Sequence, residues 1–189
     1  MRIVGGRHRG RRLATPEGRD IRPTADRARE ALFNLLAHGP YAGDAGPMPT
    51  GIDVLDAFAG TGALGFEALS RGAAHVTFLE QDAAAVRLIK QNAAALGETP
   101  NVSVLQRDAT QPGPATRPHG LALLDAPYRS GLTVPALTAL AADGWLAEDA
   151  IVVVELGKNE ELDTTASFTL ADDRRYGAAR MVLLRYVAD

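Results

Sequence analysis

Cysteine is absent from this 189-residue chain, and its absence removes several kinds of chemistry. Without a thiol the chain can form no disulfide, no thiolate zinc site and no cysteine nucleophile. The four histidines, at positions 8, 38, 75 and 119, are scattered without the spacing of metal ligands. We therefore expect no metal site.

Long apolar runs are also absent. No stretch approaches the ~20 apolar residues that span a bilayer, and the segment Met1–Arg7 has no secretory h-region. The hydrophobic fraction of 46% and the charged fraction of 23% are those of an ordinary globular protein. We expect a cytoplasmic protein with no membrane partner, most simply a monomer.

Lysine is scarce, with two against eighteen arginines, and the charge is unevenly distributed. Residues 1–30 hold nine arginines and four acids, a net charge of +5, whereas the other 159 residues carry −8. A basic arm on an acidic body is typical of a protein that binds a polyanion. The composition therefore predicts a nucleic-acid partner.

The chain is long enough for one α/β domain with a small appendage. Residues 1–38 predict a basic β-hairpin arm over 2–14 and a helix over 25–37, followed by a Gly/Pro-rich loop that opens the main domain, 39–189. Repeating β-α units predict a mostly parallel seven-stranded sheet whose last two strands form an antiparallel pair. The expected strands are 52–58, 75–80, 102–106, 121–124, 151–156, 167–170 and 181–187; the expected helices are 63–71, 83–96 and 133–142.

The stretch Ile52–Gly65 organises the main domain. An apolar strand, a glycine turn and a helix start together predict a nucleotide-binding corner. The G-x-G-x-x-G spacing alone also matches a dinucleotide fingerprint. Asp56, at the strand end, suits a ligand with an ammonium or sulfonium group better than a pyrophosphate. We therefore predict a pocket for S-adenosylmethionine.

Four successive strands end close to a carboxylate, at Asp56, Glu80, Asp108 and Asp125. In parallel sheets ligands bind beyond the carboxyl ends of the strands, near the point where the strand order reverses. The carboxylate of Glu80 can accept both hydroxyls of a ribose. We predict that these four side chains share one site.

The motif Asp125-Ala126-Pro127-Tyr128 follows the fourth of these strands. The Asp125 carboxylate and the Ala126 carbonyl can accept hydrogen bonds from a planar exocyclic amine, while Pro127 fixes the turn. Tyr128 supplies a ring for stacking on a base. Two acceptors on the amine favour a pyramidal nitrogen whose lone pair can face a sulfonium methyl group, so the motif predicts methyl transfer to an amine.

These motifs resemble those of class I S-adenosylmethionine-dependent amino-methyltransferases, which have a Rossmann-like fold. The closer resemblance is to the RsmD family, which methylates N2 of a guanine in 16S ribosomal RNA within the small subunit or its precursor. It rests on the segments 2–6 (RIVGG), 9–11 (RGR), 22–34 (RPTADRAREALFN), 56–62 (DAFAGTG) and 176–177 (YG), together with Leu79-Glu80. The family usually has proline where Ala126 stands. Because the acceptor there is a backbone carbonyl, we expect the chemistry to survive with a looser loop.

The resemblance implies a role for each matching residue. Asp125, Ala126, Pro127 and Tyr128 would hold a guanine rotated out of its stack. The implied cofactor-binding residues are Asp56, Phe58, Gly60, Thr61, Gly62, Glu80, Gln81, Asp108 and Ala109, with Thr24 and Arg27 closing over the pocket. The implied RNA contacts are Arg7, Arg9, Arg11 and Arg12, toward phosphates.

Other functions remain open from the residues alone. The same fold could methylate adenine N6 in DNA or RNA, or a glutamine side chain in a protein. A nicotinamide-dependent oxidoreductase would match the glycine spacing but would leave Asp56 and the 125–128 motif without a role. A non-enzymatic RNA-binding assembly factor is the last alternative, and the retained carboxylates argue against it.

Overall fold

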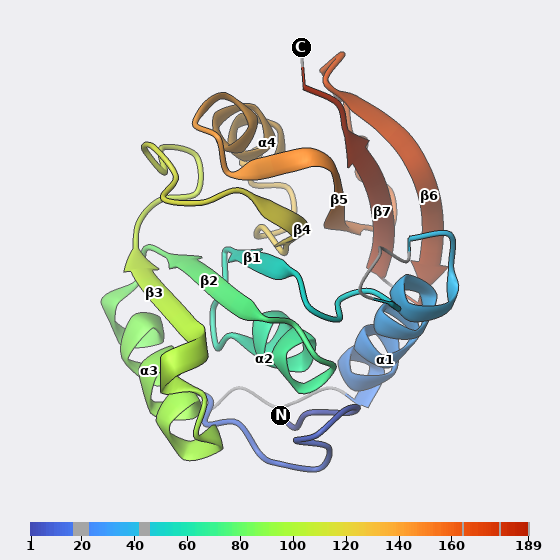
Figure 1. Cartoon of the computed structure of the whole chain (residues 1–189). Coiled ribbons are helices and arrows are strands. Elements are labelled where there is room, and N and C mark those ends of the chain that lie inside the picture. The colour runs from blue at the N-terminus through green and yellow to red at the C-terminus, as the bar shows by residue number, and fades with distance from the viewer. Residues whose placement is uncertain (17–22, 42–45, 164, 178, 189) are drawn as a thin grey trace.

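The computed structural model describes residues 1–16, 23–41, 46–163, 165–177 and 179–188, with only the backbone of 23–25. Its helices and strands alternate along most of the chain (Figure 1). The helices are α1 (Pro23–His38), α2 (Ala63–Ser70), α3 (Ala83–Leu96), η1 (Thr99–Asn101) and α4 (Thr133–Ala142). The strands are β1 (Asp53–Ala57), β2 (His75–Glu80), β3 (Val102–Gln106), β4 (His119–Leu124), β5 (Leu146–Gly157), β6 (Phe168–Tyr176) and β7 (Ala179–Tyr186).

The strands of the described residues form one seven-stranded sheet in the order β3-β2-β1-β4-β5-β7-β6. Strands β1 to β5 pair in parallel, whereas β7 runs antiparallel to both β5 and β6. The chain leaves β3 at one edge and re-enters the sheet at β4, beside β1. The strand order therefore reverses between β1 and β4, where a ligand site is expected.

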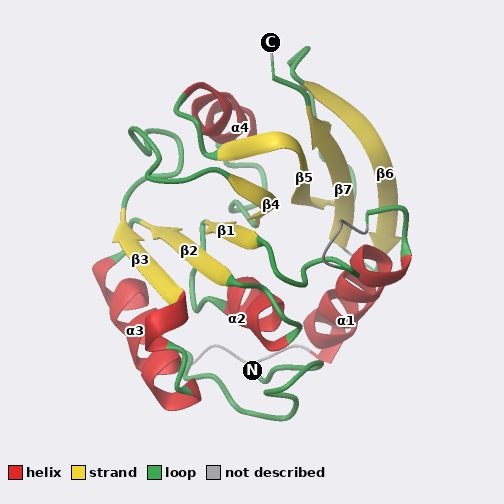
Figure 2. Ribbon diagram, in the orientation of Figure 1, coloured by secondary structure: helices red, strands yellow, loops and turns green. Residues whose placement is uncertain are grey.

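Both faces of the sheet are covered, as continuous apolar strands require (Figure 2). Along β4, Leu121 and Leu123 face one apolar cluster and Ala122 and Leu124 face the other, because side chains alternate along a strand. The first cluster contains buried residues of α1, α2 and α3, and the second contains those of α4. This arrangement confirms the predicted α/β, Rossmann-like fold.

The last strands are longer than the sequence indicated. Strand β5 begins at Leu146 rather than residue 151, and β6 extends to Tyr176 rather than residue 170. Strand β6 is an edge strand, and most of its residues are exposed. An edge strand that is solvated on its outer side carries no apolar alternation to mark its length, and so the pattern predicted only its start.

The N-terminal arm returns on itself as predicted, but it is not a regular two-stranded ladder. A single antiparallel bridge joins Arg2 and Arg12, and the Ile3 N–H donates to the Arg11 carbonyl at 3.0 Å. Ile3 and Leu13 are buried in the cluster that also contains α1, α2 and α3. The arm therefore rests on the main domain, because its apolar residues have a core to enter. The division into segments 1–38 and 39–189 stays a prediction.

No helix of the described residues is both long and apolar enough to traverse a bilayer.

Candidate active site

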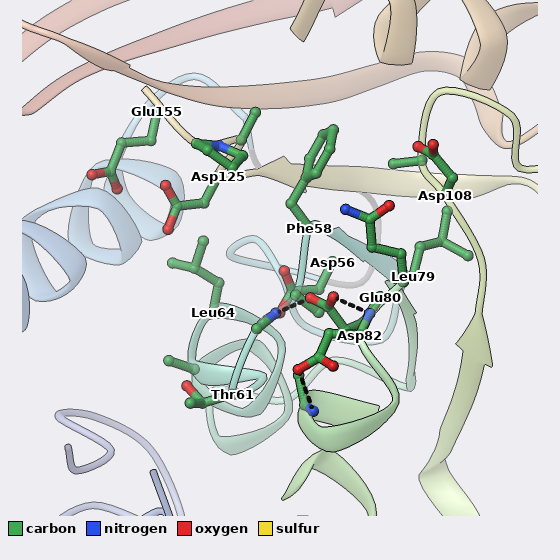
Figure 3. A pocket seen from close by; sticks show the side chains of 18 of the residues that line it. Asp56, Phe58, Thr61, Leu64, Leu79, Glu80, Asp82, Asp108, Asp125 and Glu155 are labelled. Carbon is green, nitrogen blue, oxygen red and sulfur yellow. Dashed lines mark hydrogen bonds between the residues drawn. The ribbon is translucent and has the colours of Figure 1, made fainter. Parts of the chain in front are cut away.

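A cavity of about 750 Å³ opens at the carboxyl ends of β1 to β5 (Figure 3). It lies at the predicted reversal of strand order, between β1 and β4. Its lining includes six carboxylates, which come from successive strand ends and from the start of α3. These are Asp56, Glu80, Asp82, Asp108, Asp125 and Glu155.

The turn from β1 to α2 brings backbone close to the cavity. Gly62, the residue before α2, has φ of 78°, a left-handed conformation that glycine adopts without strain. A Cβ built there would approach the Phe66 ring within 2.7 Å. Gly62 itself does not line the cavity, so its role is to shape the turn, while Phe58, Gly60 and Thr61 line the wall.

Asp56 is buried within β1, with 1% of its surface exposed. Its Oδ2 accepts a hydrogen bond from the Gly65 N–H at 2.8 Å. Burial raises the pKa of this carboxyl well above its usual value; the Gly65 N–H opposes the shift, and Asp125 and Glu80 add to it. Among the described residues no Arg or Lys forms a salt bridge with Asp56, so the site favours a cationic ligand group.

Glu80 joins three segments at the end of β2. Its Oε2 accepts the Gly60 N–H at 2.7 Å, and its Oε1 accepts the Asp82 N–H at 2.8 Å. Each oxygen keeps a second acceptor position, since a carboxylate oxygen has two lone pairs. Asp82 then begins α3 by accepting the N–H groups of Ala84 and Ala85. The two backbone donors therefore hold Glu80 in place and leave one acceptor position free on each oxygen.

The far wall follows β3. Asp108 accepts hydrogen bonds from both the N–H and the hydroxyl of Thr110, each at 2.8 Å. The Arg107 guanidinium donates to the Pro112 carbonyl at 2.6 Å, which holds the loop beside it. Ala109 is buried and lines the same wall. Phe58 and Leu79 add apolar surface to the lining of the cavity.

The 125–128 motif stands at the other end of the cavity, and all four of its residues line it. Asp125 is exposed by surface area, while neighbouring protein atoms still partly bury its carboxyl group. This burial, together with the charge of Glu155, raises the pKa of Asp125 above its ordinary value. Tyr128 is 51% exposed, and its hydroxyl donates to Glu155 Oε1 at 2.6 Å.

Two acids that sequence reasoning missed hold this loop. Glu155 of β5 accepts the Tyr128 hydroxyl, and Glu160 accepts the N–H groups of Arg129 and Gly157 at 3.2 and 3.1 Å. Glu155 lies near the end of a fifth strand, as the four predicted acids lie near the ends of theirs. The strand-end pattern could therefore have identified it, had it been carried to β5.

The two residues predicted to close over the cofactor lie differently. Arg27 does not line the main cavity; it lines a second hollow of about 360 Å³ together with Arg9 and Glu30. The side chain of Thr24 lies outside what the structure describes. The main cavity is instead bordered by Met1, Thr15 and Pro16 of the arm.

The four arm arginines differ in their contacts. Arg7 forms a 2.7 Å ion pair with Glu98, and Arg11 donates to the Ala95 carbonyl at 2.5 Å. Arg9 and Arg12 are exposed, and Arg9 lines the second hollow. Contacts at the C-terminal end of α3 therefore hold Arg7 and Arg11, whereas Arg9 lies beside residues of α1.

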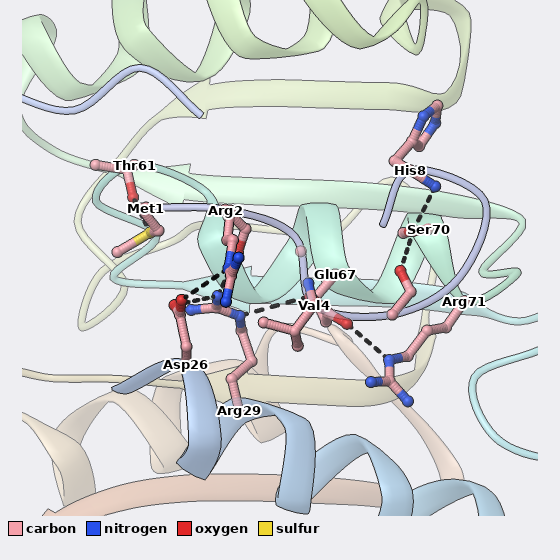
Figure 4. Close-up of polar contacts among 12 residues, drawn as sticks. Met1, Arg2, Val4, His8, Asp26, Arg29, Thr61, Glu67, Ser70 and Arg71 are labelled. Atoms are coloured by element: carbon pink, nitrogen blue, oxygen red, sulfur yellow. Dashed lines mark hydrogen bonds and ion pairs between the residues drawn. The ribbon is translucent and has the colours of Figure 1, made fainter. Parts of the chain in front are cut away.

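Glu67 of α2 anchors the arm (Figure 4). This fully buried carboxylate accepts the Val4 N–H at 2.8 Å and Arg71 Nε at 2.7 Å, and Arg29 Nε lies 3.6 Å from it. Arg29 also donates to the Arg2 carbonyl at 2.6 Å. We call the set Arg29, Glu67 and Arg71 the arm-docking cluster.

The fold and the carboxylate-lined cavity define a methyltransferase of Rossmann-like architecture. The solved structure of the putative methyltransferase yhhF from Escherichia coli superposes with a TM-score of 0.83 and 37% identity, over 100% of this chain and 99% of that one. A putative RNA methyltransferase from Pyrococcus horikoshii, 16% identical with a TM-score of 0.67, shares the fold.

The chain belongs to the family described as "Conserved hypothetical protein 95", the RsmD family, whose model matches residues 1–185. Ribosomal RNA small subunit methyltransferase D of Escherichia coli K12 is 41% identical over 159 residues, which cover 82% of this chain and 74% of that protein. The protein of the same name from Haemophilus influenzae is 35% identical over 94% of this chain and 89% of its own length. The predicted family is confirmed.

Proposed function

We propose that this chain transfers a methyl group from S-adenosylmethionine to the exocyclic N2 of one guanine in small-subunit ribosomal RNA. The observation that carries the proposal is the placement of the 125–128 motif at one end of a cavity whose other end suits a nucleoside. The names of the relatives, ribosomal RNA small subunit methyltransferases, support the substrate class.

The cavity residues fit the cofactor. Asp56 is a buried carboxylate whose protein partner is a neutral N–H, so it would accept the cofactor's ammonium group. Glu80 would take the ribose hydroxyls on lone pairs that its two backbone donors leave free. Asp108 and Ala109 would border the adenine. When bound, S-adenosylmethionine supplies an electrophilic methyl group on its sulfonium.

The chain's own contribution to the reaction is alignment. The Asp125 carboxylate and the Ala126 carbonyl would accept hydrogen bonds from the amine, which turns its lone pair toward the methyl group. Tyr128 would stack on the base, worth roughly 1–3 kcal/mol. Asp125 is a full acceptor toward the amine only when its carboxyl group is ionised. After the transfer, the amine loses one proton to solvent. Holding the two reactants in line accounts for much of such a rate enhancement.

The RNA is expected to reach the site across the arm, where Arg9 and Arg12 are exposed. Arg7 and Arg11, which contact Glu98 and Ala95, would add phosphate contacts from fixed positions. Phosphate contacts fix register and orientation, whereas the cavity reads the base. We expect one chain to act on one small subunit or its precursor.

The experiment uses labelled S-adenosylmethionine with small subunits that lack the modification, followed by RNA digestion and mass spectrometry. The expected product is one N2-methylguanosine in the small-subunit RNA. Label in adenine N6 or in protein glutamine would keep the cofactor pocket and discard the substrate. An absence of transfer to RNA, DNA and protein would instead favour a non-enzymatic assembly factor.

A further inference from the structure

Glu155 is a cavity carboxylate that has no role in the proposed function and, unlike Asp82, caps no helix. It lies near the end of β5, where Val154 pairs in parallel with Leu124 of β4. Glu155 and Asp125 each follow one member of that pair, so they stand on adjacent strands at the same edge. Figure 3 shows both side chains on the same side of the cavity, across from Asp108.

The orientation of Glu155 is fixed by one bond. The Tyr128 hydroxyl donates to Oε1 at 2.6 Å, and Oε2 accepts no hydrogen bond from the described residues. Among those residues, no salt bridge to Arg or Lys neutralises Glu155 or Asp125. The two side chains therefore present acceptors, without donors, to anything that enters this end of the cavity.

Two adjacent acceptors match one kind of base edge. Guanine carries neighbouring donors, N1–H and the N2 amine, on its Watson–Crick edge. Adenine presents an unprotonated N1, whose lone pair would face a carboxylate. A flipped base is read through this edge, and a polar group left facing the wrong partner is strongly disfavoured.

We propose that Glu155 selects guanine by accepting N1–H on Oε2 while Asp125 accepts a hydrogen of the N2 amine. This assignment rests on the proposed guanine-N2 reaction and adds to it a residue that determines specificity. Tyr128 then has two tasks, since its ring stacks on the base and its hydroxyl holds Glu155 in position. Burial and then the charge of Glu155 raise the pKa of Asp125. Donors from one base to both carboxylates would offset this repulsion.

The test separates N1–H from the N2 amine. Small subunits are reconstituted with RNA in which the methylated guanine is replaced by 2-aminopurine, which keeps the N2 amine but has a lone pair at N1. A 6-thioguanine substitution, which keeps N1–H, controls for the altered C6 position. For the wild-type protein we expect kcat/KM on 2-aminopurine to be lower than on guanine by roughly 10- to 100-fold. On 6-thioguanine it should stay within a few-fold of guanine.

The variant Glu155→Gln sharpens the test, because its amide can donate to an unprotonated N1. We expect kcat/KM on guanine to fall roughly 10-fold or more and the preference over 2-aminopurine to disappear or reverse. Glu155→Asp should keep the preference at a lower rate. Glu161→Gln, which removes the same charge from an exposed neighbour outside the cavity, should match the wild type.

The outcomes are distinct. If wild-type protein methylates no guanine N2, the proposed function fails and this inference fails with it. If it methylates guanine and 2-aminopurine equally well, or if Glu155→Gln keeps the wild-type preference, only the role of Glu155 is overturned. S-adenosylhomocysteine should raise the melting temperature of each variant as it does for the wild type, which shows that the pocket is folded.

Discussion

Two buried carboxylates beside the β1–α2 turn, Asp56 and Glu67, differ in whether a positive charge lies next to them. Glu67, in the arm-docking cluster, lies beside Arg29 and Arg71 and also accepts a backbone N–H. Asp56, equally buried, has one backbone N–H and no salt bridge among the described residues. A buried charge is costly unless it is paired. The protein therefore neutralises a buried charge where it joins two segments, and leaves one without a salt bridge at the cavity, where the proposed cofactor would supply the cation.

Among the cavity carboxylates that have no salt bridge within the described residues, the largest effect should come from Asp125→Ala. Removing the acceptor that orients the amine should lower the transfer rate by about 10²–10³-fold or more, while S-adenosylhomocysteine still binds. Single-turnover transfer to small subunits and calorimetric titration of the product cofactor measure the two quantities. Normal turnover in this variant would show that the 125–128 motif is not the active site.

In the arm-docking cluster, where arginines neutralise the buried carboxylate, Glu67→Gln should destabilise the fold. Breaking a buried ion pair by removing one partner typically costs about 3–5 kcal/mol, because the remaining charge stays buried. Arg29, which is 5% exposed, keeps its 2.9 Å ion pair with Asp26, so we expect a cost toward the lower end of that range. Urea unfolding measures the destabilisation, with the exposed Glu161→Gln as a control. A change in unfolding free energy no larger than the control's would remove the arm-docking cluster as a structural element.

Asp56→Asn should give the opposite result. The raised pKa of Asp56 means that the folded state binds more protons than the unfolded state, so its ionisation lowers stability as pH rises above the usual carboxyl value. The amide should therefore raise the melting temperature of the ligand-free protein at pH 7. It should also weaken S-adenosylhomocysteine binding by roughly 10- to 100-fold, through loss of a charged hydrogen bond. Destabilisation equal to that of Glu67→Gln would break the contrast.

The exposed arm should matter for RNA affinity and not for the cofactor. The double variant Arg9→Glu, Arg11→Glu should weaken subunit binding, and its log–log salt slope should become shallower by about one for each phosphate that the arm no longer binds. The double variant Arg174→Glu, Arg175→Glu, an equal change of charge on the exposed edge strand β6, provides the control. Equal weakening in both proteins would place the RNA elsewhere than on the arm.

The smallest effect is a shift along the pH axis. Burial and the charge of Glu155 raise the pKa of Asp125 to about 7. Transfer should therefore fail as pH falls through this pKa, which lies above the usual carboxyl value of about 4. Glu155→Gln removes the neighbouring negative charge, so the inflection should move to lower pH. Single-turnover rates between pH 4.5 and 9 (a range of roughly two units on either side of the expected inflection) measure it. An unmoved inflection would show that the two carboxylates do not interact.

The sequence was sufficient for the fold and for the four carboxylates at successive strand ends. Strand alternation and the glycine turn are local patterns, and the parallel sheet then brings its strand ends to one edge. The same strand-end pattern extends to Glu155, which lies within the strand expected over 151–156. Its place beside Asp125, however, depends on β5 pairing with β4, which no local spacing specifies.

Two further residues show the same limit. In the sequence, Glu67 resembles an exposed helix residue, because α1 and the arm, which bury it, are distant in the chain. Arg27 was placed over the cofactor, but the direction in which α1 presents its polar side depends on packing. In both cases the deciding contacts join segments that are distant in the chain.

The exposed edge strand β6 has a consequence for the protein's behaviour at high concentration. It offers unpaired backbone donors and acceptors, together with Leu170 at 67% exposure, to any other strand edge. A register irregularity after Leu170 and four consecutive charged residues, 172–175, interrupt this edge. Such features discourage edge-to-edge pairing between molecules. The polar residues of β6 leave no apolar alternation by which its length could be predicted. The same residues disfavour aggregation through this edge.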